Sequence, residues 1–140
     1  MQDIFTTIRS SIVAKIKSDA DKIASTYPSD RSVFESFPSA IVTPSESIAD
    51  YSDSSMDQMD IGFTIRVHQP IAQDGQTDAD SILDGVVDQL LTIFTQKNVL
   101  GIACDWVLPV PSVWGYQDRE SGPMRTAEIR LKCRKYIDKN

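Results

Sequence analysis

The feature that most constrains the fold is an alternation of apolar and charged residues near the C-terminal end. Within residues 125–138, RTAEIRLKCRKYID, one parity is apolar: Ala127, Ile129, Leu131, Cys133 and Ile137. The other parity is charged: Glu128, Arg130, Lys132 and Arg134. This period of two predicts a strand with one buried face and a basic stripe on the other face. Lys135 interrupts the apolar parity, so we expect either an edge position or a bulge that turns Tyr136 inward.

A second alternation, in residues 59–67, predicts another long strand that ends by Pro70. Its apolar parity consists of Met59, Ile61, Phe63, Ile65 and Val67. His68, the only histidine in the chain, falls on the polar parity and has no Cys beside it. We therefore expect an exposed histidine at the end of a strand, and neither a metal ligand nor a member of a catalytic triad.

Apolar residues spaced by three and four predict two helices. The first covers residues 3–24, which include Ile4, Ile8, Ile12 and Ile16, and Tyr27-Pro28 should stop it. The second starts at Thr77 or Asp78 and runs to about Lys97, and its wide apolar stripe is typical of packing on a sheet. Gly85 lies inside the second helix, where we expect close approach to a strand or to the first helix.

One short strand, a third long strand and three connections complete the prediction. Residues 39–43 and 102–110 are predicted as strands, whereas residues 27–38 and 109–123 are predicted to be irregular because they contain several prolines and glycines. Phe34 and Phe37 should pin the first of these connections. Residues 45–57 predict a loop rich in Ser and Asp, either a plain surface loop or one that orders against a partner.

The element order is helix, short strand, long strand, helix and two strands. It predicts a single α+β domain over residues 1–140, with a mainly antiparallel four-stranded sheet and both helices packed on one face. Cys104 and Cys133 fall on apolar parities and should be small buried hydrophobes without a disulfide. No signal peptide and no apolar run of about 20 residues is present, so we expect a protein that is made and used on the cytoplasmic side, without a membrane contact.

Charge is divided between different parts of the chain, whose net charge is −6. Residues 67–96 contain no Lys or Arg but carry Asp74, Asp78, Asp80, Asp84 and Asp88, and residues 46–60 form a second block without a cation. Residues 119–139 hold seven of the fourteen basic residues. This distribution disfavours nucleic-acid binding overall, but it would let the acidic part attract the basic part of another copy. The alternative is two ordinary solvated faces.

The side chains give no pattern that supports catalysis. The sequence has no Gly-rich phosphate loop, no Cys/His pairing and no metal-ligand spacing, and the segment DGQTDAD lacks the Gly and Glu positions of a calcium loop. We expect a protein that is not an enzyme and that uses no cofactor and no metal. Trp114 and Tyr116 lie in the connection before the last strand, where they either cap the core or anchor a partner.

The order and lengths of these segments resemble the tail terminator, or tail-completion, proteins of long-tailed bacteriophages. The resemblance rests on the N-terminal helix, FPSAIVTP, DIGFTIRVHQP with the acidic loop and DADSILDGVVDQLLTIF after it, and AEIRLKCRKYI after a long loop. It implies a homohexameric ring on the tail tube that stops tube growth and docks the head-completion protein. It also implies a place in the virion at the tail-neck junction, after assembly in the host cytoplasm.

In such a ring, DNA would pass through the lumen without specific binding, and an acidic middle segment suits that role. The ring or tube interface that we expect has three parts. They are the basic stripe of the last strand and its flank (Arg125, Arg130, Lys132 and Arg134), the acidic residues Asp74, Asp78 and Asp80, and the aromatic anchors Trp114 and Tyr116. Two alternatives stay open: another neck component, such as a head-completion or connector protein, and a small cytosolic α+β binding module that dimerises through its sheet.

Overall fold

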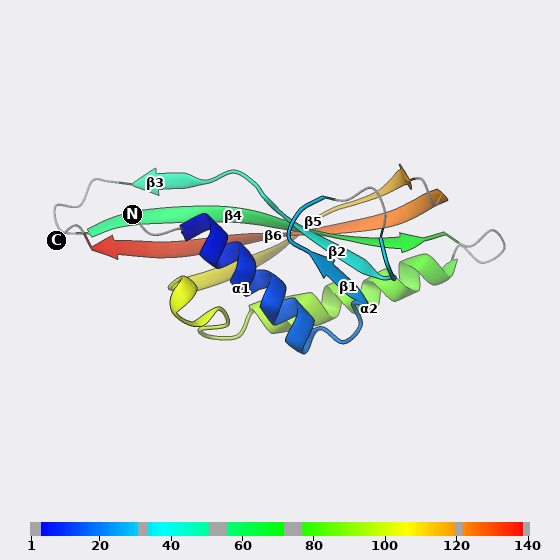
Figure 1. Cartoon of the computed structure of the whole chain (residues 1–140), viewed down its shortest axis with the longest axis horizontal. Coiled ribbons are helices and arrows are strands. Elements are labelled where there is room, and N and C mark those ends of the chain that lie inside the picture. The colour runs from blue at the N-terminus through cyan, green and yellow to red at the C-terminus, as the bar shows by residue number, and fades with distance from the viewer. Residues whose placement is uncertain (1–3, 31–33, 51–55, 72–76, 120–121, 139–140) are drawn as a thin grey trace.

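The computed structural model describes residues 4–30, 34–50, 56–71, 77–119 and 122–138. The elements in these ranges are α1 (Ile4–Asp19), β1 (Ser25–Tyr27), β2 (Ser39–Pro44), β3 (Ile48–Asp50), β4 (Met56–Pro70), α2 (Thr77–Phe94), the 3-10 helix η1 (Gly101–Ala103), β5 (Trp106–Arg119) and β6 (Gly122–Asp138). Figure 1 shows α1 and α2 on the same side of the sheet. The predicted α+β class is confirmed.

The strands form one six-stranded sheet in the order β1-β2-β4-β6-β5, and β3 pairs with β4 off this path. Among the described pairs, β1 and β2 are parallel and the others are antiparallel. The predicted four-stranded antiparallel sheet is therefore correct only for the longer strands, because it lacks β1 and β3. Each of these is three residues long, which is too short to produce a readable alternation.

The centre of the sheet is the pairing of β4 with β6, which runs from Met56 opposite Asp138 to Pro70 opposite Met124. This register places both apolar parities on the helix side, where Phe63 lies opposite Leu131 and Ile65 opposite Ile129. The helices cover these residues with apolar side chains that are fully buried: Ile8, Ile12, Ile16, Leu83, Val86, Leu90 and Phe94. The two alternations in the sequence thus line one core.

The first helix is shorter than predicted, because α1 ends at Asp19 and β1 occupies part of the predicted stop. Beyond the helix, the backbone amide of Ala24 donates to the carbonyl oxygen of Pro38 (2.8 Å), so the chain has already joined the sheet. Ala20 and Ile23 are nevertheless buried. Their spacing continues the helical period across the turn, and this is why the apolar pattern alone overextends the helix.

The largest error concerns the segment before β6. The predicted strand 102–110 begins instead as η1, where Ile102 is 97% exposed, and β5 then continues through the predicted irregular connection to Arg119. Leu108 lies opposite Lys132 and Val110 opposite Arg130, so these two apolar residues lie on the face away from the helices. Because β5 is an edge strand, Pro109 and Pro111 can lie in it without costing a ladder hydrogen bond.

The predicted loop 45–57 contains strand β3, which pairs Ile48 with Asp60. Residues 51–55 lie outside the described part of the chain. At the far end of β6, no bulge interrupts the register, so that alternative for Lys135 is wrong. The edge alternative is correct, because β5 starts opposite Arg134, so that Lys135 has no partner residue in β5. Nζ of Lys135 donates to the carbonyl oxygen of Ile102 (3.1 Å).

A second apolar cluster lies on the face of the sheet away from the helices. It joins Tyr27, Phe34, Ile41 and Met124, with Phe37 packed against them. Phe34 and Phe37 therefore pin the connection 28–38, as predicted, and they pin it over one end of this face. Farther along the same face, Leu108, Val110, Arg130 and Lys132 are exposed.

Gly85, Cys104 and Cys133 agree with expectation. A Cβ added at Gly85 would lie 3.2 Å from Nζ of Lys22, in the turn after α1, so the helix is closely approached there. Both cysteines are buried and free, although Cys104 lies before β5 and not within a strand. Within the described ranges, no helix is both long and apolar enough to cross a membrane.

Candidate functional site

The surface that we call the open sheet face consists of Leu108, Val110, Arg130 and Lys132. β5 and β6 place these residues opposite one another on the side of the sheet away from the helices. Leu108 is 48% exposed and Val110 46% exposed, and both cations are exposed. Neither Arg130 nor Lys132 lies within 4 Å of a carboxylate among the residues that the structure describes. Two unpaired cations beside two exposed aliphatic side chains suit contact with another protein.

A hollow of about 430 Å³ borders the open sheet face, between β6 and residues 45–46. Its wall includes Val110, Arg130 and Lys132 on one side and Glu46 and Asp60 on the other. The chain crosses closely over β4 at Gly62, whose carbonyl oxygen accepts from the Ser45 amide (2.8 Å). The amide of Gly62 in turn donates to Oγ of Ser47 (3.2 Å). Because Gly62 has no side chain, residues 45–46 can lie close to β4 and form one wall of the hollow.

Gly62→Ala should destabilise the protein by about 1–3 kcal/mol, because the new Cβ would collide with the backbone carbonyl oxygen of Glu46. Urea denaturation measures the change in the free energy of unfolding. Gly115→Ala is the matched control in β5, since its Cβ would meet only Thr126 Oγ1, at 3.4 Å. Equal stability for the two variants would contradict the close crossing at Gly62.

Arg134, a member of the predicted basic stripe, is already paired within the chain. Its Nε donates to Oδ1 of Asp60 (2.7 Å) and its Nη2 donates to Oδ2 (2.9 Å), across the β4–β6 pair. The guanidinium also lies over the ring of Trp106, 4.5 Å from the centroid. These hydrogen bonds hold the pKa of the Asp60 carboxyl below its ordinary value. Arg134 thus lies on the predicted face but is less available to another copy.

Arg125 lies on the opposite face, so its predicted place in the basic stripe is wrong. Its odd parity turns it toward α2, where Nε donates to Oδ1 of Asp80 (2.6 Å) and Nη1 donates to the carbonyl oxygen of Gly115 (3.0 Å). The guanidinium lies over two rings, 4.3 Å from the centroid of Tyr116 and 5.3 Å from that of Trp114. We call Trp114, Tyr116 and Arg125 the aromatic cluster.

The aromatic cluster settles how the two predicted aromatic residues lie. Trp114 is 38% exposed and Tyr116 is 72% exposed, so neither is a buried cap on the core. Asp80 and the Gly115 carbonyl hold Arg125 between them, which fixes the orientation of the cluster before any partner arrives.

The predicted acidic residues are not gathered at one site. Asp74 lies outside the described residues, and Asp78 lies in the first turn of α2. Asp80 pairs with Arg125, so this predicted attraction operates within one chain. Asp84 and Asp88 are exposed farther along α2, which contains no Lys or Arg.

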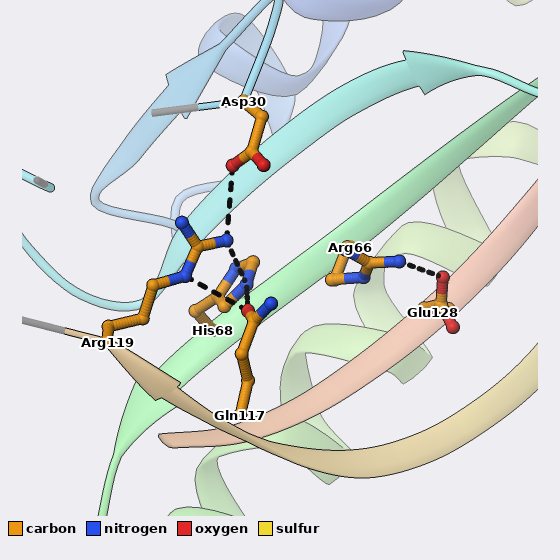
Figure 2. Close-up of polar contacts among 6 residues, drawn as sticks. All are labelled: Asp30, Arg66, His68, Gln117, Arg119 and Glu128. Carbon is orange, nitrogen blue, oxygen red and sulfur yellow. Dashed lines mark hydrogen bonds and ion pairs between the residues drawn. The ribbon is translucent and has the colours of Figure 1, made fainter. Parts of the chain in front are cut away.

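A buried polar cluster that the sequence did not predict lies under the connection 28–38 (Figure 2). His68 is 0% exposed, so the expectation of an exposed histidine is wrong. Its ring lies 4.9 Å from the Phe34 ring, and Nε2 lies 2.8 Å from Oε1 of Gln117. Because an amide oxygen can only accept, this 2.8 Å contact requires a proton on Nε2, whereas the longer contact of the same nitrogen with Nη2 of Arg119 (3.4 Å) is a hydrogen bond only in the other tautomer. Nδ1 of His68 is buried and has no hydrogen-bond partner among the described residues.

Arg119 connects this cluster to the connection above it. Nε of Arg119 also donates to Oε1 of Gln117 (3.0 Å), and Nη2 forms an ion pair with Oδ1 of Asp30 (3.1 Å). Its guanidinium lies 5.1 Å from the centroid of the Phe34 ring. Burial lowers the pKa of His68, and the charges of Arg119 and Arg66 lower it further, whereas Gln117 and Asp30 act in the opposite direction. His68 is therefore neutral at pH 7.

One signal in the sequence could have located this cluster. Ile41 and Met124 fall on the outer parity of their strands, where an isolated apolar residue on an otherwise polar face has to be covered. The aromatic residues at positions 27, 34 and 37 supply the cover. Arg66, next along β4, instead pairs with Glu128 (3.0 Å) at the edge of the covered region (Figure 2).

The described part of the chain contains no group of three or more His, Cys, Asp or Glu residues that could hold a metal ion. The contact with Cys104 and burial raise the pKa of the Cys133 thiol, which keeps it protonated. The sequence matches no model of a known protein family, and no curated protein matches it.

Proposed function

We propose that this chain is a structural virion protein that forms a ring on the end of a phage tail tube. The ring stops polymerisation of the tube and offers a docking surface to the head-completion protein. The resemblance in element order and length supports this role, and the α+β class is compatible with it. The observation that carries the proposal is the open sheet face, because exposed aliphatic and unpaired cationic side chains together form a surface that a second protein can cover.

The aromatic cluster supports a second contact, with the tube. Trp, Tyr and Arg are the residue types that most often dominate binding energies at protein interfaces. Here Trp114 and Tyr116 are exposed on both sides of an arginine that is already oriented. The cluster lies on the α2 side of the sheet, so a ring could use the open sheet face for one contact and the aromatic cluster for another.

Electron microscopy of the purified protein, alone and mixed with tail tubes, tests the proposal. We expect rings in the free protein or rings that form on tube ends. In an infection that lacks the protein, tails should be overlong or unable to join heads. Tails of normal length that carry heads would refute the assignment, whatever rings the purified protein forms.

Trp114→Ala should weaken attachment to tail tubes by at least tenfold, because it removes an exposed aromatic anchor. The variant should stay folded but lose some stability, since the side chain is only 38% exposed and its ring contacts the Arg125 guanidinium. Co-sedimentation with purified tubes measures the attachment, and thermal melting checks the fold. Ile102→Ala is the control, because Ile102 is 97% exposed on a different part of the surface. Equal attachment by the two variants would remove the aromatic cluster from the tube interface.

A dimeric binding module is the second candidate: the exposed Leu108 and Val110 on the open sheet face favour it, whereas Arg130 and Lys132 on the same face oppose the packing of two such faces. Its signature would be a stable dimer at all accessible concentrations, without rings on tubes. A different neck component would also form an assembly, but it would bind heads or connectors in preference to tube ends. Mixing the purified protein with each of these structures separates the possibilities.

A further inference from the structure

Two surfaces with opposite charge lie on opposite sides of the molecule. The open sheet face carries Arg130 and Lys132 on the side away from the helices. On the other side, α2 turns its buried residues Leu83, Val86 and Leu90 toward the sheet, so Asp84 and Asp88 lie on its outward side. We call Ser81, Asp84, Asp88 and Thr92, all exposed, the outward face of α2.

Neither surface forms an ion pair within the described chain. No described cation lies within 4 Å of Asp84 or Asp88, and no described carboxylate lies within 4 Å of Arg130 or Lys132. Lys22 approaches the edge of the outward face beside Gly85, and Glu46 and Asp60 line the hollow next to Arg130 and Lys132. Because Asp60 is already paired with Arg134, the open sheet face keeps an excess of positive charge and the outward face of α2 an excess of negative charge.

Symmetry decides which contact suits these charges. If two copies met through the same face, Arg130 and Lys132 would approach their own counterparts, and two α2 helices would bring aspartates together. Like charges at a contact oppose association. When the open sheet face of one copy meets the outward face of α2 of another, opposite charges meet, and each copy still has one free surface of each kind.

We propose that copies of this chain associate head to tail, with the open sheet face of one copy covering the outward face of α2 of the next. This inference deepens the ring described above and rests on that proposed function for its biological setting. Exposed ion pairs contribute little by themselves, so Leu108 and Val110 supply the apolar area that the contact needs. The hollow beside Val110, bordered by Arg130 and Lys132, gives the side chains of a helix room to enter.

This contact differs from the one expected from the sequence. Arg125 and Arg134 are paired within the chain, with Asp80 and Asp60 respectively. The cations that remain are Arg130 and Lys132, and the carboxylates that remain on α2 with described side chains are Asp84 and Asp88. The predicted contact between acidic and basic residues thus keeps Arg130 and Lys132 from the basic stripe, and Asp84 and Asp88 are the members of the acidic segment that take part.

A charge-swap experiment tests the proposal. One variant combines Arg130→Glu with Lys132→Glu, and the other combines Asp84→Lys with Asp88→Lys. All four side chains are exposed, so both variants should fold, which circular dichroism and thermal melting can check. Sedimentation velocity over a range of concentrations should show association at least tenfold weaker for each variant alone than for the original protein.

Mixing the two variants gives the decisive result. The reversed sheet face of one variant is complementary to the reversed α2 of the other, and their unaltered surfaces are also complementary. An equimolar mixture should therefore regain association as alternating copies. Lys17→Glu combined with Lys97→Glu is the matched control for the variant of the open sheet face, because it makes the same change in net charge at exposed positions elsewhere. This control should associate like the original protein.

Three results would overturn the inference. They are a wild-type protein that stays monomeric or stops at a dimer, charge variants that associate normally, and a mixture that does not recover. If charge variants still form rings on tail tubes, the inference fails while the proposed function stands. If tails lacking the protein are normal and carry heads, the proposed function fails, and the sedimentation result still decides how copies associate.

Discussion

Replacing Leu131 with alanine should lower the free energy of unfolding by about 2–5 kcal/mol, one of the two largest effects that we expect. Leu131 is 1% exposed and lies in β6 between Phe63 of β4 and Pro109 of β5, so the helices cannot close the resulting space without moving. Urea denaturation, with the midpoint and slope analysed together, measures the loss.

The neighbouring residue provides the control for this prediction. Lys132 is exposed on the open sheet face, and Lys132→Ala should change stability by no more than about 0.5 kcal/mol. Thr64→Ala, in the outer parity of β4, should also cost less than Leu131→Ala, although Thr64 is only 9% exposed. A reversed ranking would mean that the two faces of the sheet have been assigned the wrong way round.

The second large effect is a loss of stability in mild acid that originates at His68. An unfolded histidine has a pKa near 6.5, and burial lowers the pKa of His68 in the folded protein. The unfolded chain therefore binds the proton more readily. The stabilisation that comes from holding His68 neutral in the folded protein is complete above pH 6.5, and it is lost as the pH falls toward the folded pKa of His68.

We expect the free energy of unfolding to fall between pH 7.5 and 5.5, by at most about 1.4 kcal/mol, because one differential proton changes it by up to about 1.4 kcal/mol per pH unit below the unfolded pKa. The buried ring faces Arg119, Arg66 and Asp30, so a proton on its unpartnered Nδ1 would add a cation beside two others. Asp60 does not contribute in this window, since its pKa is lowered further into the acid range.

Urea denaturation at the two pH values measures this loss, and His68→Gln is the matched variant. Glutamine keeps a donor for Gln117 but cannot titrate, so most of the pH dependence should disappear. Because His68 is the only histidine, its imidazole NMR signals can be assigned without ambiguity. A titration midpoint at or above 6.5 in the folded protein would contradict the predicted direction.

The sequence predicts the central part of the fold well, because two long alternations share one face. Residues 59–67 and 125–138 carry apolar side chains at every second position, and the pairing of β4 with β6 needs only that periodicity. The wide apolar stripe of α2 is equally informative, and its start at Thr77 was predicted. Where an apolar pattern is long and its two faces differ clearly in polarity, the need to bury the apolar face is enough to predict the type of element.

The sequence predictions are wrong where an apolar pattern runs from one element into the next, or where its apolar residues lie on the face of the sheet away from the helices. Ile102 to Val110 alternates without a break, yet a 3-10 turn and an edge strand divide it, and Leu108 and Val110 face away from the helices. Prolines in residues 109–111 indicated a loop because a central strand excludes them, but an edge strand does not. Edge positions depend on tertiary neighbours that no local window contains.

The candidate surface was predicted only in part, for the same reason. Parity correctly placed Arg130 and Lys132 on the outer face, but it could not reveal that Asp60 already binds Arg134 from a strand 74 residues away in sequence. Arg125 was assigned to the stripe although its odd number turns it toward α2. Which charges are available to a partner depends on contacts between distant segments.

The position of β6 also determines how the protein can be made. β6 is the last described element of the chain, yet it lies inside the sheet between β4 and β5. During synthesis, the apolar faces of β4 and α2 therefore leave the ribosome before β6 has been made. Ile65 cannot pack beside Ile129 until β6 follows. Closing so long a connection costs entropy before any contact compensates for it. A chain cut short before β6 would lose the middle of its sheet, and nascent copies would have to avoid one another until synthesis reached that strand.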